Sequence, residues 1–154
     1  MISIIAALSE NLVIGRGGST PWHLPPDLRR FRDLTMGTVC IMGRHTYLSL
    51  PHGLPGRRCI VLSHEPLGGI MTCHRLADAI ACADGSDVSI CGGTGVYAEA
   101  LSYADRLLLT IVHLSLPGDA LFPWWYRHGF TLTDRTACPP HEGLQWHIEI
   151  WRRL

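Results

Sequence analysis

Short apolar runs alternate along the chain with segments whose apolar residues recur at helical spacing. The runs are apolar at successive positions and end at turns, which is typical of strands buried on both faces of a parallel sheet. They cover Ile2–Leu8, Val39–Met42, Cys59–Leu62, Val88–Cys91 and Leu107–Val112. Between them the pattern predicts helices over Pro26–Thr35, Thr46–Leu50, Leu76–Ala83 and Gly95–Tyr103. We therefore expect an α/β fold with a mostly parallel, doubly wound central sheet flanked by helices.

The C-terminal third follows a different pattern. Phe130–Thr136 and Gln145–Arg152 alternate apolar and polar residues and are joined by a turn-rich loop, which predicts a C-terminal antiparallel hairpin at the sheet edge. No repeat or linker divides the chain, so residues 1–154 are expected to form a single domain. The segment Ser9–Leu24 is predicted as one long glycine-rich loop, and loops of that length are usually functional or mobile.

Composition narrows the possible functions. With 47% hydrophobic and 17% charged residues the chain is a folded globular protein, not a disordered one. Its 13 basic and 13 acidic residues balance, so neither a nucleic acid nor an anionic membrane is an expected partner. All the basic residues are arginine, which excludes mechanisms that need a lysine amine, such as Schiff-base formation or a P-loop.

Targeting segments and metal sites are not expected either. No apolar stretch is long enough to span a membrane, and the first residues lack the basic start of a signal peptide, so we expect a cytoplasmic protein. The six cysteines form no CxxC pair, and the nine histidines show no metal-ligand spacing. The cysteines are predicted to be buried free thiols, with no metal bound.

One carboxylate lies among apolar residues of a predicted helix. Asp27 is one turn before Phe31, so it falls on the apolar face formed with Leu28 and Leu34. It could be an ordinary first-turn residue favoured by the helix dipole. Alternatively, it anchors a cationic or amidine-like ligand edge inside an apolar pocket, where a buried carboxylate needs a donor. The other charged residues of this helix are expected on the opposite side: Arg29, Arg30, Arg32 and Asp33.

Turns that suit phosphate binding follow three predicted strands. Gly92-Gly93-Thr94-Gly95 connects a strand to a helix, and its backbone can approach a pyrophosphate or simply allow tight packing. Gly43-Arg44-His45-Thr46 repeats the arrangement with an arginine that can bind phosphate. Ser63-His64 ends a third strand and offers a hydroxyl and an imidazole, unless these are ordinary turn residues. Together the first two turns favour a dinucleotide ligand.

These motifs together resemble those of bacterial dihydrofolate reductases from Met1 to about Arg153. Their order and spacing agree as well as their identity. The resemblance rests on Ile4-Ile5-Ala6-Ala7-Leu8, Val13-Ile14-Gly15, Pro21-Trp22-His23-Leu24-Pro25-Pro26-Asp27-Leu28, Met42-Gly43-Arg44-His45-Thr46-Tyr47, Leu54-Pro55-Gly56-Arg57 and Gly92-Gly93-Thr94-Gly95-Val96-Tyr97.

The resemblance implies an oxidoreductase that reduces 7,8-dihydrofolate to tetrahydrofolate by hydride transfer from NADPH, supplying one-carbon metabolism and thymidylate synthesis. It implies that Asp27, as the only ionisable side chain in the pocket, binds the pterin and promotes protonation of its nitrogen 5. The implied catalytic residues are Asp27, Trp22, Thr110 and Tyr97. The implied substrate-binding residues are Ile5, Asp27, Leu28, Phe31, Leu50, Leu54, Arg57, Cys91 and Thr110, with Arg57 pairing with the glutamate α-carboxylate of the substrate.

The resemblance also implies how the cofactor binds, with the 2′-phosphate near Arg44, Ser63 and His64. The implied cofactor-binding residues are Ala7, Ile14, Gly15, Thr20, Gly43, Arg44, His45, Thr46, Ser49, Leu62, Ser63, His64, Gly92, Gly93, Thr94, Gly95, Val96 and Tyr97. Antifolate inhibitors are further expected ligands, and a monomer is the expected state.

Some positions depart from the family pattern. Thr20 replaces a common apolar residue in the mobile loop, and Gly95 replaces a common arginine. His64 replaces a small polar residue, which predicts a pH-dependent cofactor affinity. Asp119 matches a residue that holds the mobile loop closed in the family.

Three other functions fit these residues less well. A related pyrimidine reductase would have little use for Asp27 or Arg57, and a silent binder would be expected to have lost Asp27, Thr110 or the glycine pair. A zinc deaminase is excluded because its ligand motif is missing.

Overall fold

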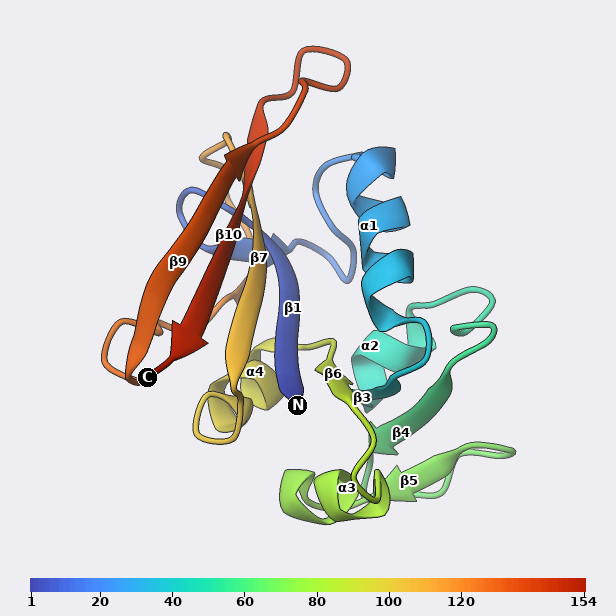
Figure 1. Ribbon diagram of the computed structural model, residues 1–154. Helices are drawn as coiled ribbons and strands as arrows, with labels where there is room; N and C mark the ends of the chain where they lie inside the picture. The colour runs from blue at the N-terminus through green and yellow to red at the C-terminus, as the bar shows by residue number, and fades with distance from the viewer.

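The computed structural model describes residues 1–154 and contains an eight-stranded sheet with the order β5-β4-β3-β6-β1-β7-β10-β9 (Figure 1). The strands from β5 to β7 pair in parallel, whereas β10 pairs antiparallel with both β7 and β9. The mostly parallel sheet and the C-terminal hairpin are therefore confirmed. The strands of this sheet are β1 Ile2–Ser9, β3 Val39–Gly43, β4 Arg58–Leu62, β5 Met71–Cys73, β6 Val88–Ile90, β7 Arg106–Val112, β9 Phe130–Ala137 and β10 Trp146–Arg153.

Four helices cover the two faces of the sheet: α1 Pro25–Thr35, α2 Arg44–Leu48, α3 Leu76–Cys82 and α4 Thr94–Ala100. Alternate residues of β3 lie on opposite faces of the sheet. Val39 and Ile41 belong to the main core, whereas Cys40 and Met42 belong to a second apolar cluster. Residues of α3 and α4 pack in the main core, and Tyr47 of α2 packs against the second cluster. Figure 1 shows α1 beside β1 and above α2, away from α3 and α4.

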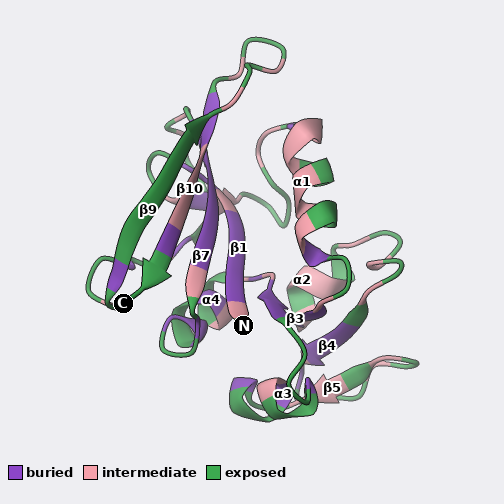
Figure 2. Cartoon of the chain, in the orientation of Figure 1, coloured by how far each residue is buried: buried purple, intermediate pink, exposed green.

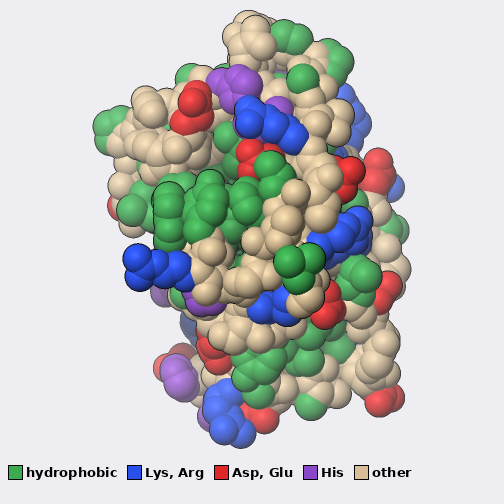
Figure 3. Space-filling model, turned by 60° about the vertical axis from the view of Figure 1, so that its left-hand side comes forward, with side chains coloured by type: hydrophobic (Ala, Val, Ile, Leu, Met, Phe, Trp, Pro, Cys, Tyr) green, Lys and Arg blue, Asp and Glu red, His purple; other side chains and the backbone are tan.

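The central strands are almost completely buried, as their uninterrupted apolar sequence predicts. In Figure 2, β1 and β7 are mostly buried, whereas β9 at the edge is exposed along nearly its whole length. None of the helices is both long and apolar enough to cross a membrane. Figure 3 shows basic and acidic side chains interspersed on one face of the molecule, in keeping with the balanced charge count.

Several sequence predictions need correction. The segment Ser9–Leu24 is not one continuous loop, because it contains β2 Val13–Gly15, which pairs antiparallel with β8 Ala120–Leu121. The helix predicted over Thr46–Leu50 begins two residues earlier, directly after Gly43. The helix predicted over Gly95–Tyr103 ends at Ala100 and continues as turns.

The cysteine prediction is only partly right. All six cysteines are free, but only Cys40 and Cys59 are buried. Cys82 is exposed, and the other three are half-buried. The two buried thiols occupy directly paired positions on β3 and β4, whereas the remaining four lie at strand or helix ends or in loops, where burial is incomplete.

Candidate active site

A cavity of about 300 Å³ lies between the middle of β1 and the first half of α1. This volume is at the lower end of the range of small-molecule sites. The cavity is lined by segments that are far apart in the sequence: β1, α1, the residues after β6 and one residue of β7. Its lining residues are Ile5, Ala6, Ala7, Thr20, Trp22, His23, Leu24, Asp27, Leu28, Arg30, Phe31, Cys91, Tyr97 and Thr110.

Asp27 is the acidic residue of this cavity, and it has a partner on the sheet. The Thr110 hydroxyl donates a hydrogen bond of 2.5 Å to Asp27 Oδ1, although the two residues are 83 positions apart. Burial raises the pKa of Asp27 above the usual value for aspartate, while the hydrogen bond from Thr110 and the charge of Arg30 act in the opposite direction. Asp27 is therefore a partly desolvated carboxyl group that can accept donors from a bound ligand.

The sheet side of the cavity is held by a buried tyrosine. The Tyr97 hydroxyl donates a hydrogen bond of 2.8 Å to the carbonyl of Ile5, linking α4 to β1 behind the cavity. Burial raises the pKa of Tyr97, so this hydroxyl stays protonated. Cys91 contributes a half-buried thiol, whose pKa is raised well above its usual value by the neighbouring Cys40 thiol and by burial. Both groups are neutral donors at physiological pH.

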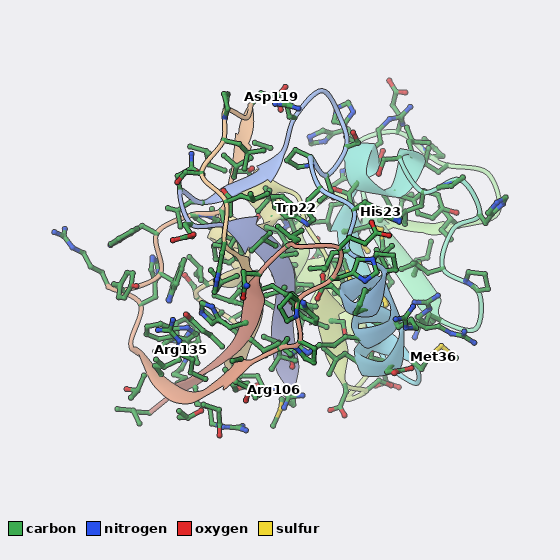
Figure 4. The ribbon with its side chains drawn as sticks, turned by 90° about the horizontal axis from the view of Figure 1, so that it is seen from above. Trp22, His23, Met36, Arg106, Asp119 and Arg135 are labelled. Atoms are coloured by element: carbon green, nitrogen blue, oxygen red, sulfur yellow. The ribbon has the colours of Figure 1, made fainter.

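The segment that follows β2 lines a further side of the cavity. Thr20 and Trp22 line it from this side, and Trp22 and His23 lie between the sheet and the beginning of α1 (Figure 4). The segment is held from the β8 side, because the amide of Gly17 donates a hydrogen bond of 3.0 Å to Asp119 Oδ2. A second bond of 3.1 Å runs from the amide of Asp119 to the carbonyl of Gly15.

Two ionisable lining residues were missed by the sequence prediction that Asp27 would be alone in the pocket. Arg30 was expected on the charged side of α1, but it lines the cavity and is half-buried. Burial lowers its pKa, and the charge of Asp27 opposes that shift. The helical spacing could have predicted the position of Arg30 in the cavity, because a residue three positions after Asp27 lies on the same side of a helix. His23 also lines the cavity, and nothing in its local sequence marks it.

The predicted substrate-binding residues divide into two groups. Ile5, Asp27, Leu28, Phe31, Cys91 and Thr110 line the cavity, and Leu28 is 62% exposed although it is apolar. Leu50 and Leu54 lie beyond it, packed against the second apolar cluster together with Cys91. Arg57 donates hydrogen bonds to the Thr35 hydroxyl at 3.0 Å and to the carbonyl of Pro55 at 3.2 Å. It therefore lies at the far end of α1 from Asp27.

The two predicted phosphate turns lie against each other. The amide of Gly43 donates to the carbonyl of Gly92 at 2.9 Å, and the Gly92–Gly93 peptide bond is cis. A Cβ added at Gly43 would approach Val96 at 3.4 Å, and one added at Gly93 would approach the Thr46 hydroxyl at 3.5 Å. A side chain at Gly92 would meet the Tyr97 ring, and its φ of 112° suits glycine alone. The two turns thus form a cradle of bare backbone.

The remaining predicted cofactor residues are spread over the cavity, strand ends and turns. Ala7, Thr20 and Tyr97 line the cavity itself, whereas Arg44 donates a 3.4 Å hydrogen bond to the buried Ser63 hydroxyl. The Ser49 hydroxyl donates to the carbonyl of Thr46 at the end of α2. The others occupy strand ends or turns: Ile14 and Gly15 on β2, His45 on α2, Leu62 and His64 at the end of β4, and Thr94, Gly95 and Val96 on α4.

The chain is similar to known proteins of one family. The family model described as dihydrofolate reductase matches residues 1–153. The dihydrofolate reductase type 3 of Salmonella typhimurium is 42% identical, over 97% of this chain and 95% of that protein. The dihydrofolate reductase of Neisseria gonorrhoeae is 44% identical, over 88% of this chain and 86% of its own length.

A solved structure is similar over the whole fold. The dihydrofolate reductase from Enterococcus faecalis complexed with NADP(H) and RAB-propyl superimposes with a TM-score of 0.91, at 29% identity, over 99% of this chain and 96% of that one. The half-buried carboxylate, the facing glycine turns, the family model and these relatives lead to one conclusion. The chain belongs to the dihydrofolate reductase family.

Proposed function

We propose that this protein reduces 7,8-dihydrofolate to 5,6,7,8-tetrahydrofolate with NADPH as the hydride donor. The single observation that carries the proposal is the Asp27 carboxyl group, held by Thr110 inside a cavity that the glycine cradle adjoins, in a chain of the dihydrofolate reductase family. The proposal includes the supply of tetrahydrofolate for one-carbon metabolism and thymidylate synthesis.

Asp27 binds the pterin edge of the substrate. Its carboxylate accepts hydrogen bonds from the 2-amino group and the adjacent ring nitrogen, and the short bond from Thr110 fixes its orientation. The negative charge favours a proton at nitrogen 5, which makes carbon 6 a better hydride acceptor. Trp22 holds an ordered water near this edge, and Tyr97 keeps the carbonyl of Ile5 in place through its hydroxyl.

The rest of the substrate extends along α1. Leu28 and Phe31 contact its benzoyl ring, so the bound substrate covers the exposed apolar side chain of Leu28. Leu50 and Leu54 extend this apolar wall toward Arg57. The Arg57 guanidinium pairs with the glutamate α-carboxylate, and its hydrogen bond to Thr35 holds it at the end of α1.

The facing turns fit a dinucleotide. Bare backbone at Gly43, Gly92 and Gly93 leaves room where any side chain would contact Val96, Tyr97 or Thr46, so phosphate oxygens can approach the amides closely. Arg44, His45 and Thr46 supply charge and donors for the phosphates on one side of the cradle, and Gly93 to Val96 hold the phosphates on the other. Ala7, Ile14, Gly15, Thr20 and Ser49 lie on the nicotinamide side, and Leu62, Ser63 and His64 on the adenosine side. When bound, NADPH supplies the hydride.

We also place the protein in the cytoplasm as a monomer that can bind antifolate inhibitors. The relative of known structure bound to NADP(H) and RAB-propyl supports a nicotinamide cofactor and a second small ligand in the same fold. Light scattering coupled to gel filtration tests the monomeric state directly.

The test is the reaction itself. Purified protein is mixed with NADPH and dihydrofolate, loss of the reduced cofactor is followed by absorbance, and the product is identified by chromatography. Formation of tetrahydrofolate in equal amount to the NADPH consumed supports the proposal. If both ligands bind without any oxidation, the protein is a silent binder and the proposed activity is wrong.

A further inference from the structure

A second cavity, of about 210 Å³, lies between the end of α1 and the sheet. Ile5 of β1 lines both this cavity and the candidate active site, but the proposed reaction uses no other residue of it. Met36 lines the second cavity just after the end of α1, and Arg106 lines it from the start of β7 (Figure 4). The other polar side chains of its wall belong to Ser3, Thr38, Asp87 and Ser89.

Arg106 brings a permanent positive charge to this wall. Its Nε donates a hydrogen bond of 2.8 Å to Ser3 Oγ, which fixes the guanidinium group against β1. This bond uses one of the five N–H donors of an arginine side chain. Nη1 and Nη2 form no hydrogen bond or ion pair within the chain. Because the side chain is half-buried, this unpaired fork of donors faces the cavity and can bind an anion.

The hydroxyl groups beside Arg106 supply one further free donor. Thr38 donates to the carbonyl of Thr35 at 2.8 Å, so the 2.8 Å bond between Thr38 and Ser89 uses the proton of Ser89. Both of these hydroxyl protons are therefore committed. Ser3 is 5% exposed, and its oxygen accepts the bond from Arg106 while its own proton has no acceptor in the chain. The Ser3 hydroxyl is thus a buried donor next to the guanidinium group.

The nearby carboxylates do not neutralise this charge. Asp87 is the only acidic residue that lines the cavity, and its Oδ1 lies 3.0 Å from the amino group of Met1. Asp105 precedes Arg106 in the sequence, but its Oδ2 accepts the amide of Ile2 at 2.7 Å and it does not line the cavity. The charges of Asp87 and the amino group cancel, so the wall keeps the positive charge of Arg106.

We propose that this cavity binds a small oxyanion, with the Nη groups of Arg106 and the hydroxyl of Ser3 as donors. The planar fork of a guanidinium group matches two oxygens of a phosphate or a carboxylate. The volume is below the range of sites for larger organic ligands, which favours inorganic phosphate or a short carboxylate. The proposal does not depend on the identity of the cofactor or on the proposed reaction.

The test measures the melting temperature as sodium phosphate or sodium acetate replaces sodium chloride at constant ionic strength. An ion that binds the native state raises the melting temperature with its concentration, which gives its affinity. The variants are Arg106→Gln and Ser3→Ala in the cavity, Arg44→Gln at the phosphate cradle, and Arg135→Gln on the exposed strand β9 as a matched control. Each variant is compared with its own melting temperature in chloride, so a loss of stability does not hide the response.

We expect at least one of the two ions to stabilise the native chain, Arg44→Gln and Arg135→Gln equally. Arg106→Gln should weaken the affinity about tenfold, because it removes a charge-assisted contact, and Ser3→Ala about threefold. The ion that binds more tightly shows whether the ligand is a phosphate or a carboxylate. In crystals soaked in selenate, anomalous diffraction should place the anion against Arg106 and Ser3.

Three results would overturn the proposal. Neither ion may stabilise the protein, in which case selenate in the crystal would be an adventitious ion only. Arg106→Gln and Ser3→Ala may respond like the native chain. Alternatively, Arg44→Gln alone may abolish the response, which would place the ion in the phosphate cradle and leave the second cavity without a ligand.

Discussion

The position of Asp27 on the apolar side of its helix could be predicted from the sequence, but its hydrogen-bond partner could not. Its position one turn before Phe31 predicts a carboxylate on the apolar side of α1. Thr110 could not be paired with it from spacing alone, because the contact depends on the packing of α1 against β7. His23 could not be predicted to line the cavity for the same reason, whereas the position of Arg30 in the cavity follows from its helical spacing.

The raised pKa of Asp27 means that its ionisation works against folding. The native state holds the proton more tightly than the unfolded chain, so stability is lost as pH rises from about 3.9, the ordinary aspartate pKa, through the native pKa. Asp27→Asn removes this loss while keeping an acceptor for Thr110. We expect the variant to be more stable than the native protein at pH 7, with the advantage disappearing toward pH 4. Urea unfolding at the two pH values checks this, and an equal or lower stability at pH 7 would contradict it.

Thr110 tunes this carboxyl group through one hydrogen bond. The bond favours the charged form of Asp27 and lowers its pKa, so Thr110→Val should raise that pKa further. The limb of the profile of kcat/KM against pH that reports Asp27 should move to higher pH. Thr131→Val on the exposed strand β9 is the control and should leave the profile unchanged. Movement of the limb to lower pH would refute the assignment.

At the scale of elements, continuous apolar runs predicted five strands of the sheet to within one residue at each end. They failed for β2, β5 and β8, which contain only two or three residues each. Such strands exist because a neighbour supplies their hydrogen bonds, as β8 does for β2, so no periodicity marks them. The pairing of β2 with β8 matters functionally, since it brings Asp119 to Gly17.

The contact between Asp119 and Gly17 holds the segment that covers the cavity. Asp119→Ala removes a charge-assisted hydrogen bond of 3.0 Å. The equilibrium between the position in which the segment covers the cavity and positions away from it should then shift about tenfold toward the latter. We expect kcat to fall by a similar factor, while the melting temperature stays nearly constant because Asp119 is exposed. Single-turnover kinetics beside thermal unfolding measure both quantities. A large loss of stability with unchanged kcat would show that the contact is only structural.

A polar chain across β10 was not predicted from the alternating pattern. His147 Nδ1 lies 2.7 Å from His113 Nε2, its Nε2 lies 2.7 Å from Glu149 Oε2, and Trp151 Nε1 donates to Glu149 Oε1 at 2.9 Å. Glu149→Leu leaves two buried donors without a partner and should lower the free energy of unfolding by about 3 kcal/mol. Denaturant titration measures the change.

The neighbouring Arg152 provides the control for this experiment. It lies on the same strand, is exposed, and makes no side-chain hydrogen bond. Arg152→Gln should therefore change the free energy of unfolding by less than about 0.5 kcal/mol. Equal effects of Glu149→Leu and Arg152→Gln would show that the polar chain does not stabilise the hairpin.

At the scale of the whole molecule, the sheet order brings the chemistry together. Parallel strands end at one edge, so the turns after β3, β4 and β6 meet there although they are separated in sequence. The sequence could predict which residues follow each strand, but not that β3 lies between β4 and β6. That order is what places Gly43 against Gly92 and opens the cradle beside Asp27.

The central claim is that this cavity performs hydride transfer assisted by Asp27. The most direct measurement is the rate of NADPH oxidation with dihydrofolate for the native protein and for Asp27→Asn, at pH 7 and at progressively lower pH. We predict rapid oxidation by the native protein, and a variant that is at least about hundredfold slower at pH 7 with nearly unchanged NADPH affinity. The difference should narrow as solvent supplies the proton. A variant that matches the native rate at pH 7 would contradict the account.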